Sequence, residues 1–279
     1  MFEDFFTNID ISSFLFLGVA CFFASFIDAI AGGGGLITVP AYLASGLPAH
    51  TALGTNKVSS SIGTIASTWK FAASGKINWK MVRTMVPFSL IGAFIGVKTV
   101  VLIDSKYLYP IAIILLLLVL VYSLMNKDLG EENNFLGLNS KNIRNGRIMA
   151  IIMGFYDGFF GPGTGSFLIF ALIRIFKLDF TNASGNAKIL NLTSNLASMF
   201  LFIYLGKVNF FYSIPIGIIM IFGAILGAKM AVTKGTKFIK PMFLIVTSIV
   251  LVKMILESML GIDVGGLVKE FFLSITRSF

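Results

Sequence analysis

Apolar and polar residues follow each other along the chain in blocks of about membrane length. Long apolar runs occupy residues 12–31, 50–73, 82–103, 107–125, 144–160, 183–204, 211–232 and 241–260, and a helix needs roughly 20 residues to cross a bilayer. Two shorter runs, 35–46 and 165–176, follow glycine clusters, where a continuous helix is disfavoured. The pattern predicts an all-α integral membrane protein with eight long transmembrane helices and two half-helices after Gly-rich breaks.

The overall composition excludes a soluble globular protein. Of 279 residues, 56% are hydrophobic and 13% are charged, and the mean hydropathy is +0.90. Soluble domains carry about 25% charged residues. The chain therefore lacks the charge needed to cover a water-exposed surface, and we expect a lipid bilayer as its surroundings.

The net charge of +9 is explained by where the basic residues lie. They gather in connections between apolar runs, and such positively charged loops stay in the cytoplasm. Placing the longest polar connection, 126–147, inside also places the basic groups of 76–83, 174–177 and 234–240 inside. We expect a multi-pass protein of a bacterial inner membrane with both termini outside, and no nucleic-acid partner.

The two halves of the chain repeat each other. An offset of 129 aligns Asp28 and its glycine cluster with Asp157 and the second cluster, and after a two-residue gap an offset of 131 aligns Lys57 with Lys188. Because each copy has five segments, an odd number, the second copy enters the membrane from the opposite side. This predicts two inverted-topology repeats of five segments each. The expected parts are residues 1–125, a cytoplasmic linker 126–143, residues 144–260 and an amphipathic tail 261–279.

Lys57 and Lys188 are the main candidates for contact with a substrate, because each lies inside an apolar segment where a charge is costly. Helical spacing adds a polar stripe beyond each lysine. The stripes are Ser60, Thr64 and Ser67 after Lys57, and Asn191, Asn195 and Ser198 after Lys188, with Thr55, Asn56 and Asn186 just before the lysines. Snorkelling of the lysines to an interface is the alternative, but it does not explain the stripes. We expect these side chains to coordinate an anion.

Asp28 and Asp157 each precede a glycine break, and two interpretations remain open for them. Each carboxylate either accepts hydrogen bonds from free amides of the next half-helix or carries a coupling proton. The half-helix starts offer backbone N–H groups to an anion, although close packing through small residues also explains the glycines. The residues concerned are Gly33, Gly34, Gly163 and Thr164.

Enzymatic chemistry has no support in the sequence. No Ser/His/Asp arrangement is recognisable, and neither glycine cluster continues to the Gly-Lys-Ser/Thr of a nucleotide-binding loop. Cys21 is the only cysteine and His50 the only histidine, and neither belongs to a metal-binding cluster. We expect no enzyme activity, no cofactor and no metal, and a small anion as the partner of the site.

Several motifs together point to a known family. They are residues 28–35 (Asp-Ala-Ile-Ala-Gly-Gly-Gly-Gly), Pro40, residues 54–57 (Gly-Thr-Asn-Lys), residues 154–165 and the pair Asn191/Asn195. The chain resembles the TauE/SafE family of membrane permeases, also called sulfite exporters, from about residue 22 to residue 234. The resemblance implies small, mostly sulfur-containing anions as substrates: sulfite, sulfonates, sulfoacetate and thiosulfate.

The residues and the resemblance together predict a secondary transporter that exports a small anion such as sulfite or a sulfonate. Asp28 and Asp157 are the candidates for a coupling proton. A passive anion channel or uniporter would use the same charges without coupling to a proton gradient. A membrane scaffold whose broken helices only pack is the alternative of a different class.

Overall fold

The computed structural model describes residues 11–102, 130 and 132–235, together with the single positions 238, 241, 245, 248, 252 and 256. The apolar run predicted at 107–125, most of the run at 241–260 and the amphipathic tail at 261–279 lie outside the described residues. All regular structure in the described ranges is helical.

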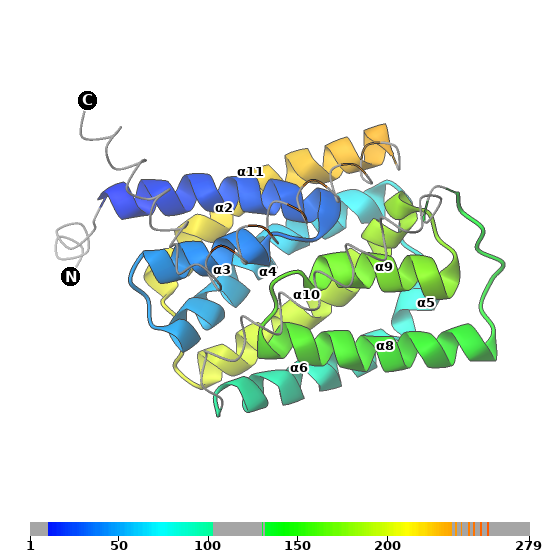
Figure 1. The fold of residues 1–279 in the computed structure, drawn as a ribbon, viewed down its shortest axis with the longest axis horizontal. Coiled ribbons are helices and arrows are strands. Elements are labelled where there is room, and N and C mark those ends of the chain that lie inside the picture. The colour runs from blue at the N-terminus through cyan, green and yellow to red at the C-terminus, as the bar shows by residue number, and fades with distance from the viewer. Residues whose placement is uncertain are drawn as a thin grey trace.

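Nine helices make up the described part of the chain (Figure 1). The long ones are α2 (Ile11–Ala31), α4 (Ala49–Ala73), α6 (Val86–Val100), α8 (Ser140–Phe159), α10 (Phe180–Tyr204) and α11 (Phe210–Lys234). The short ones are α3 (Gly35–Ala44), α5 (Trp79–Arg83) and α9 (Thr164–Phe176). Among these, α2 and α11 are long and apolar enough to cross a membrane, whereas α3, α6 and α9 are apolar but shorter.

The predicted segment 82–103 corresponds mainly to α6, while its first two residues belong to a short helix that the pattern did not predict. The chain first forms the short helix α5, whose start is capped by the Asn78 side chain accepting from the amide of Met81. Helix α6 then begins at Val86, with Pro87 in its first turn. Proline fits the first turn of a helix because it lacks only an N–H that would have no intrahelical partner there. Pro87 thus marks a new helix start rather than a continuation.

Helices of the first half pack mainly against helices of the second half. Helix α6 lies along α8, α2 lies along α11, and α4 and α10 contact each other in the centre. The contact surfaces of α6 and α11 are formed by glycines. A Cβ at Gly92 or Gly96 would overlap a backbone carbonyl of α8, and one at Gly223 or Gly227 would overlap a backbone carbonyl of α2. These glycines therefore allow backbone-to-backbone contact, the role of small residues between membrane helices.

The half-helices α3 and α9 turn back instead of continuing across the bundle (Figure 1). Helix α3 returns beside α2, so that Tyr42 packs in one apolar cluster with Leu17 and Cys21. Helix α9 returns beside α8, where the Phe176 ring reaches Gly146. Each broken pair is a hairpin that brings its glycine break into the interior of the bundle.

The two breaks meet each other at the centre. The amide of Ser166 donates to the carbonyl oxygen of Gly32 at 3.1 Å, and the Ser166 hydroxyl donates to the carbonyl of Ala31 at 2.8 Å. Gly32 has a φ of +78°, and its Cα packs on the backbone of Gly165. A side chain at either glycine would separate the two breaks, and the left-handed φ also favours glycine at position 32.

Candidate substrate site

Helices α4 and α10 place Lys57 and Lys188 in the interior, 2% and 1% exposed. Each lysine forms an ion pair with the aspartate of the other half. The Lys57 Nζ lies 2.8 Å from Oδ1 of Asp157, and the Lys188 Nζ lies 2.6 Å from Oδ2 of Asp28. Neither lysine snorkels to an interface in this arrangement. The four groups together carry no net formal charge, which reduces the cost of burying them.

Three of the four charged groups, Asp28, Lys57 and Asp157, line a small cavity of about 30 Å³. One water molecule needs about 10–15 Å³ of such a cavity, so this one has space for about two. Both halves of the chain and both glycine breaks contribute to the lining. Of the predicted site residues, Asp28, Gly34, Asn56, Lys57, Ser60, Thr64, Asp157, Asn191 and Asn195 line it. Ser67, from the first stripe, also contributes.

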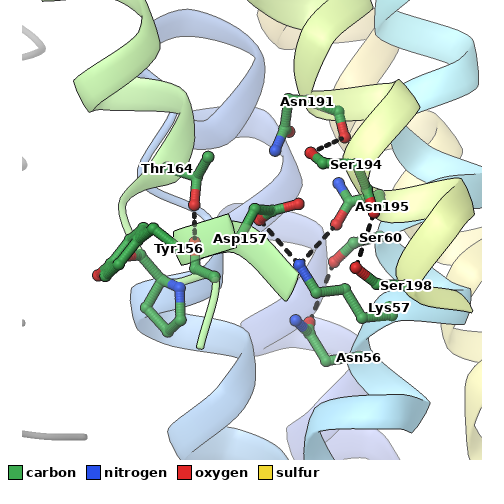
Figure 2. Close-up of polar contacts among 12 residues, drawn as sticks. Asn56, Lys57, Ser60, Tyr156, Asp157, Thr164, Asn191, Ser194, Asn195 and Ser198 are labelled. Carbon is green, nitrogen blue, oxygen red and sulfur yellow. Dashed lines mark hydrogen bonds and ion pairs between the residues drawn. The ribbon is translucent and has the colours of Figure 1, made fainter. Parts of the chain in front are cut away.

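Lys57 is the lysine that lines this cavity. Its Nζ is placed between the carboxylate of Asp157 and the side-chain oxygen of Asn195, to which it donates at 3.0 Å (Figure 2). Asn195 belongs to the predicted stripe beyond Lys188, yet it contacts the lysine of the opposite half, because α4 and α10 pack against each other. Beside it, Asn56 Oδ1 accepts from the hydroxyls of Thr38 and Ser60 at 2.6 and 3.0 Å.

The two aspartates differ in how fully they are bound. Asp28 Oδ1 accepts from the amide of Gly34 at 3.1 Å, and the Lys188 ammonium contacts both Oδ2 and the backbone carbonyl of Asp28. Asp28 thus caps the start of α3, which is one of the two interpretations of the sequence. Asp157 binds Lys57 through Oδ1, while its Oδ2 is buried without a hydrogen-bond partner among the described residues.

Several predicted residues lie away from the cavity. Thr55 Oγ1 accepts from the amide of Asn209 at 2.9 Å, and Asn186 Oδ1 accepts from the amide of Asn78 at 2.9 Å. Asn78 and Asn209 are the caps of α5 and α11. Thr55 therefore joins α4 to the start of α11, and Asn186 joins α10 to the start of α5.

The remaining predicted residues belong to the breaks or, in the case of Lys188, to the buried pair with Asp28. Lys188, Gly33, Gly163 and Thr164 are not among the residues lining the cavity. Gly163 has a φ of +84° at the start of α9, and the Thr164 hydroxyl donates to the carbonyl of Gly161. These residues shape the breaks that hold the aspartates in place.

Sequence reasoning missed part of the lining. Met220 and Ala224 of α11 close one wall, and Ser25 of α2 also faces the cavity. Two apolar residues in an apolar helix give no signal in the sequence. Gly161 and Gly165 also line the cavity, and both lie in the second glycine cluster, where the break itself was the signal.

Comparison with known proteins connects this geometry to a family. The family model described as "Sulfite exporter TauE/SafE" matches residues 17–254, which include all four charged residues of the crosswise pairs. The chain belongs to the TauE/SafE family. No solved structure matches it.

Relatives of this TauE/SafE chain span nearly its whole length. A probable membrane transporter protein of Haemophilus influenzae is 37% identical over 254 residues, covering 90% of this chain and 96% of that protein. The probable membrane transporter protein YfcA of Escherichia coli K12 is 35% identical, covering 91% and 94%. The probable membrane transporter protein ORF9 of a Sinorhizobium species is 33% identical, covering 87% and 92%. Family and relatives thus indicate a membrane transporter of the TauE/SafE type rather than a member of an enzyme family.

Proposed function

We propose that this TauE/SafE protein is a secondary transporter that exports a small sulfur-containing anion, sulfite or a sulfonate, across a bacterial inner membrane. The observation that carries the proposal is the buried ammonium of Lys57, which lines a small polar cavity at the meeting point of two broken helices. Secondary transporters built from inverted repeats bind their substrates at such central breaks. The family's description as a sulfite exporter supports the choice of anion.

The proposed architecture is a pair of inverted repeats, residues 1–125 and 144–260, each with four long segments and one half-helix. Its support is the crosswise packing of α2 on α11 and α6 on α8. The opposite directions of α2 and α8 in Figure 1 agree with it. Placing the linker 126–143 in the cytoplasm puts both termini outside, following the distribution of Lys and Arg.

The proposed binding site uses Lys57 and the polar groups that line the cavity with it. Asn195 of α10, whose Oδ1 accepts from Lys57, presents a side-chain amide, and Asn56, Ser60 and Thr64 present an amide and two hydroxyls from α4. These groups would replace the water around an anion, and the start of α3 at Gly34 adds the positive end of a helix dipole.

Substrate entry requires the cavity to enlarge, because about 30 Å³ has space for about two water molecules and not for a sulfonate. The hairpins α2–α3 and α8–α9 reach the centre from opposite ends of the bundle (Figure 1). Movement of the α8–α9 hairpin away from α4 would open the cavity toward one side. Movement of the α2–α3 hairpin together with α10, to which the Asp28–Lys188 pair joins it, would open the cavity toward the other side. This is alternating access around a fixed lysine.

The test is solute flux into proteoliposomes that contain the purified protein. The panel is sulfite, methanesulfonate, sulfoacetate and thiosulfate, with sulfate and chloride as comparators. We expect saturable flux of at least one sulfur anion and mutual competition within that group. Flux that does not saturate and is shared with chloride would indicate a channel. Absence of flux for every anion, with protein shown to be folded, would leave a scaffold and refute the proposal.

A further inference from the structure

The two crosswise ion pairs are not equivalent. In the Lys57–Asp157 pair both partners line the cavity, whereas in the Lys188–Asp28 pair only the aspartate does. Asp28 uses both carboxylate oxygens, one for Lys188 and one for the amide of Gly34. Asp157 is 1% exposed, and its Oδ2 has no partner among the residues that the structure describes. This carboxylate oxygen, which accepts no hydrogen bond from the described residues, can accept a proton.

We propose that Asp157 takes up the proton that accompanies the transported anion, while Asp28 and Lys188 form a permanent clamp. This inference rests on the proposed transport function and assigns the coupling proton to one of two aspartates that the repeat makes equivalent in sequence. It also identifies Lys57–Asp157 as the pair that opens in each transport cycle.

The exchange balances in charge and in atoms. An arriving anion takes the Lys57 ammonium, and the contact between Lys57 Nζ and Asp157 Oδ1 breaks. Two negative charges that share one ammonium in a buried site repel each other, which favours the protonated carboxyl. A proton from the aqueous side then binds to Asp157 Oδ2, and the net charge of the centre is unchanged. On release of the anion, the proton leaves and the original pair forms again.

The other titratable groups near the cavity do not replace Asp157 as the proton acceptor. Asp28 lies across the cavity but is held by Lys188 and by the start of α3. The Tyr156 hydroxyl, next to Asp157 in sequence, donates to the carbonyl of Pro162. Protonating Asp28 would leave the buried Lys188 without its counter-charge, and a charge in that position is costly.

Movement of an anion with one proton carries no net charge. Transport should therefore respond to a pH gradient and not to the membrane potential, and its direction should follow the combined gradients of anion and proton. An acidic exterior drives the anion inward, so export occurs only when the outward anion gradient exceeds the inward proton gradient. At equilibrium a gradient of one pH unit would support an accumulation of about tenfold, because one proton accompanies each anion.

The experiment uses methanesulfonate, which does not titrate near neutral pH, and vesicles that enclose a fluorescent pH indicator. For the wild type we expect one proton to enter per methanesulfonate and uptake to rise with an acidic exterior. A potassium diffusion potential set with valinomycin should have no effect. Asp157→Asn should keep methanesulfonate exchange but lose accumulation driven by the pH gradient, from about tenfold to no accumulation. Its uptake should become sensitive to the potential, because the anion then moves alone.

A comparison variant removes the other pair as a whole. Asp28→Asn combined with Lys188→Gln leaves no unpaired charge. Because Asp28 lines the cavity, we expect a lower flux in this variant, but each methanesulfonate that enters should still bring one proton. The matched control is Lys98→Gln, which removes an exposed lysine outside the cavity and should behave as the wild type. Accumulation by Asp157→Asn that still follows the pH gradient would overturn the inference, as would a double variant that carries methanesulfonate without a proton. If Asp157→Asn does not fold, wild-type uptake with no accompanying proton, or uptake driven by sodium, overturns it equally. Wild-type vesicles with no flux of any anion in the panel would instead refute the transport function itself.

Discussion

Replacing Asp28 by asparagine tests the clamp that holds the two halves together. The change keeps the shape of the side chain but removes the negative charge that lies 2.6 Å from the Lys188 Nζ. Lys188 is 1% exposed, so water does not compensate for the loss. We expect Asp28→Asn to destabilise the folded protein clearly.

The magnitude follows from the surroundings of the pair. Removing one partner of a buried ion pair costs about 3–5 kcal/mol. The Asp28 side chain is 21% exposed, and the backbone carbonyl of Asp28 still contacts Lys188, so the lower limit of about 3 kcal/mol applies. Adding Lys188→Gln removes the unpaired charge, and the double variant should recover about 2 kcal/mol of this loss.

Thermal unfolding in detergent micelles measures the effect. A loss of about 3 kcal/mol lowers the Tm by about 6–12 °C for a chain of this size. The control is Lys98→Gln, which removes an exposed lysine that packs over the Phe94 ring and should cost less than about 1 kcal/mol. Two results would refute the reasoning: Asp28→Asn as stable as the wild type, or a double variant less stable than the single one.

Two further substitutions test the packing and the joints between the halves. Gly96→Val places a side chain against the Phe155 carbonyl and should destabilise the folded protein by about 1–3 kcal/mol or prevent folding. The control Ile95→Val, on the exposed face of α6, should cost less than about 1.5 kcal/mol. Comparable yields of folded protein for both variants would contradict the close contact between α6 and α8. Thr55→Val leaves the amide of Asn209 without its acceptor, so the free energy of unfolding should fall by about 1–3 kcal/mol, and the Tm with it. The KM for a transported anion should stay unchanged, because Thr55 does not line the cavity. A raised KM in folded protein would place Thr55 in the site after all.

The hydrophobic pattern predicts most of the described helices because bilayer length and glycine breaks leave a direct mark in the sequence. The predicted runs 12–31 and 165–176 nearly coincide with α2 and α9. The short helix α5 was missed, since its five residues include Lys80 and Arg83 and lie at the edge of the apolar run that forms α6.

The candidate site was predicted in its residue types more than in its contacts. The internal repeat identifies the two lysines and the two aspartates, but an alignment of the halves does not say which lysine meets which aspartate. The crosswise pairs arise because α4 and α10 contact each other and each broken hairpin meets the other. Thr55 and Asn186 were included because they lie just before the lysines in the sequence, although their partners are caps of distant helices.

The central claim is that Lys57 binds the transported anion, and the concentration dependence of anion flux tests it most directly. Proteoliposomes with wild type, Lys57→Gln and Lys98→Gln would be compared for the sulfur anion that gives saturable flux. Losing a hydrogen bond to a charged group costs about 1.5–3 kcal/mol, which is about 10- to 100-fold in apparent affinity. The account predicts a loss of this size for Lys57→Gln and none for Lys98→Gln. Equal flux and equal affinity in folded Lys57→Gln and wild-type protein would contradict it.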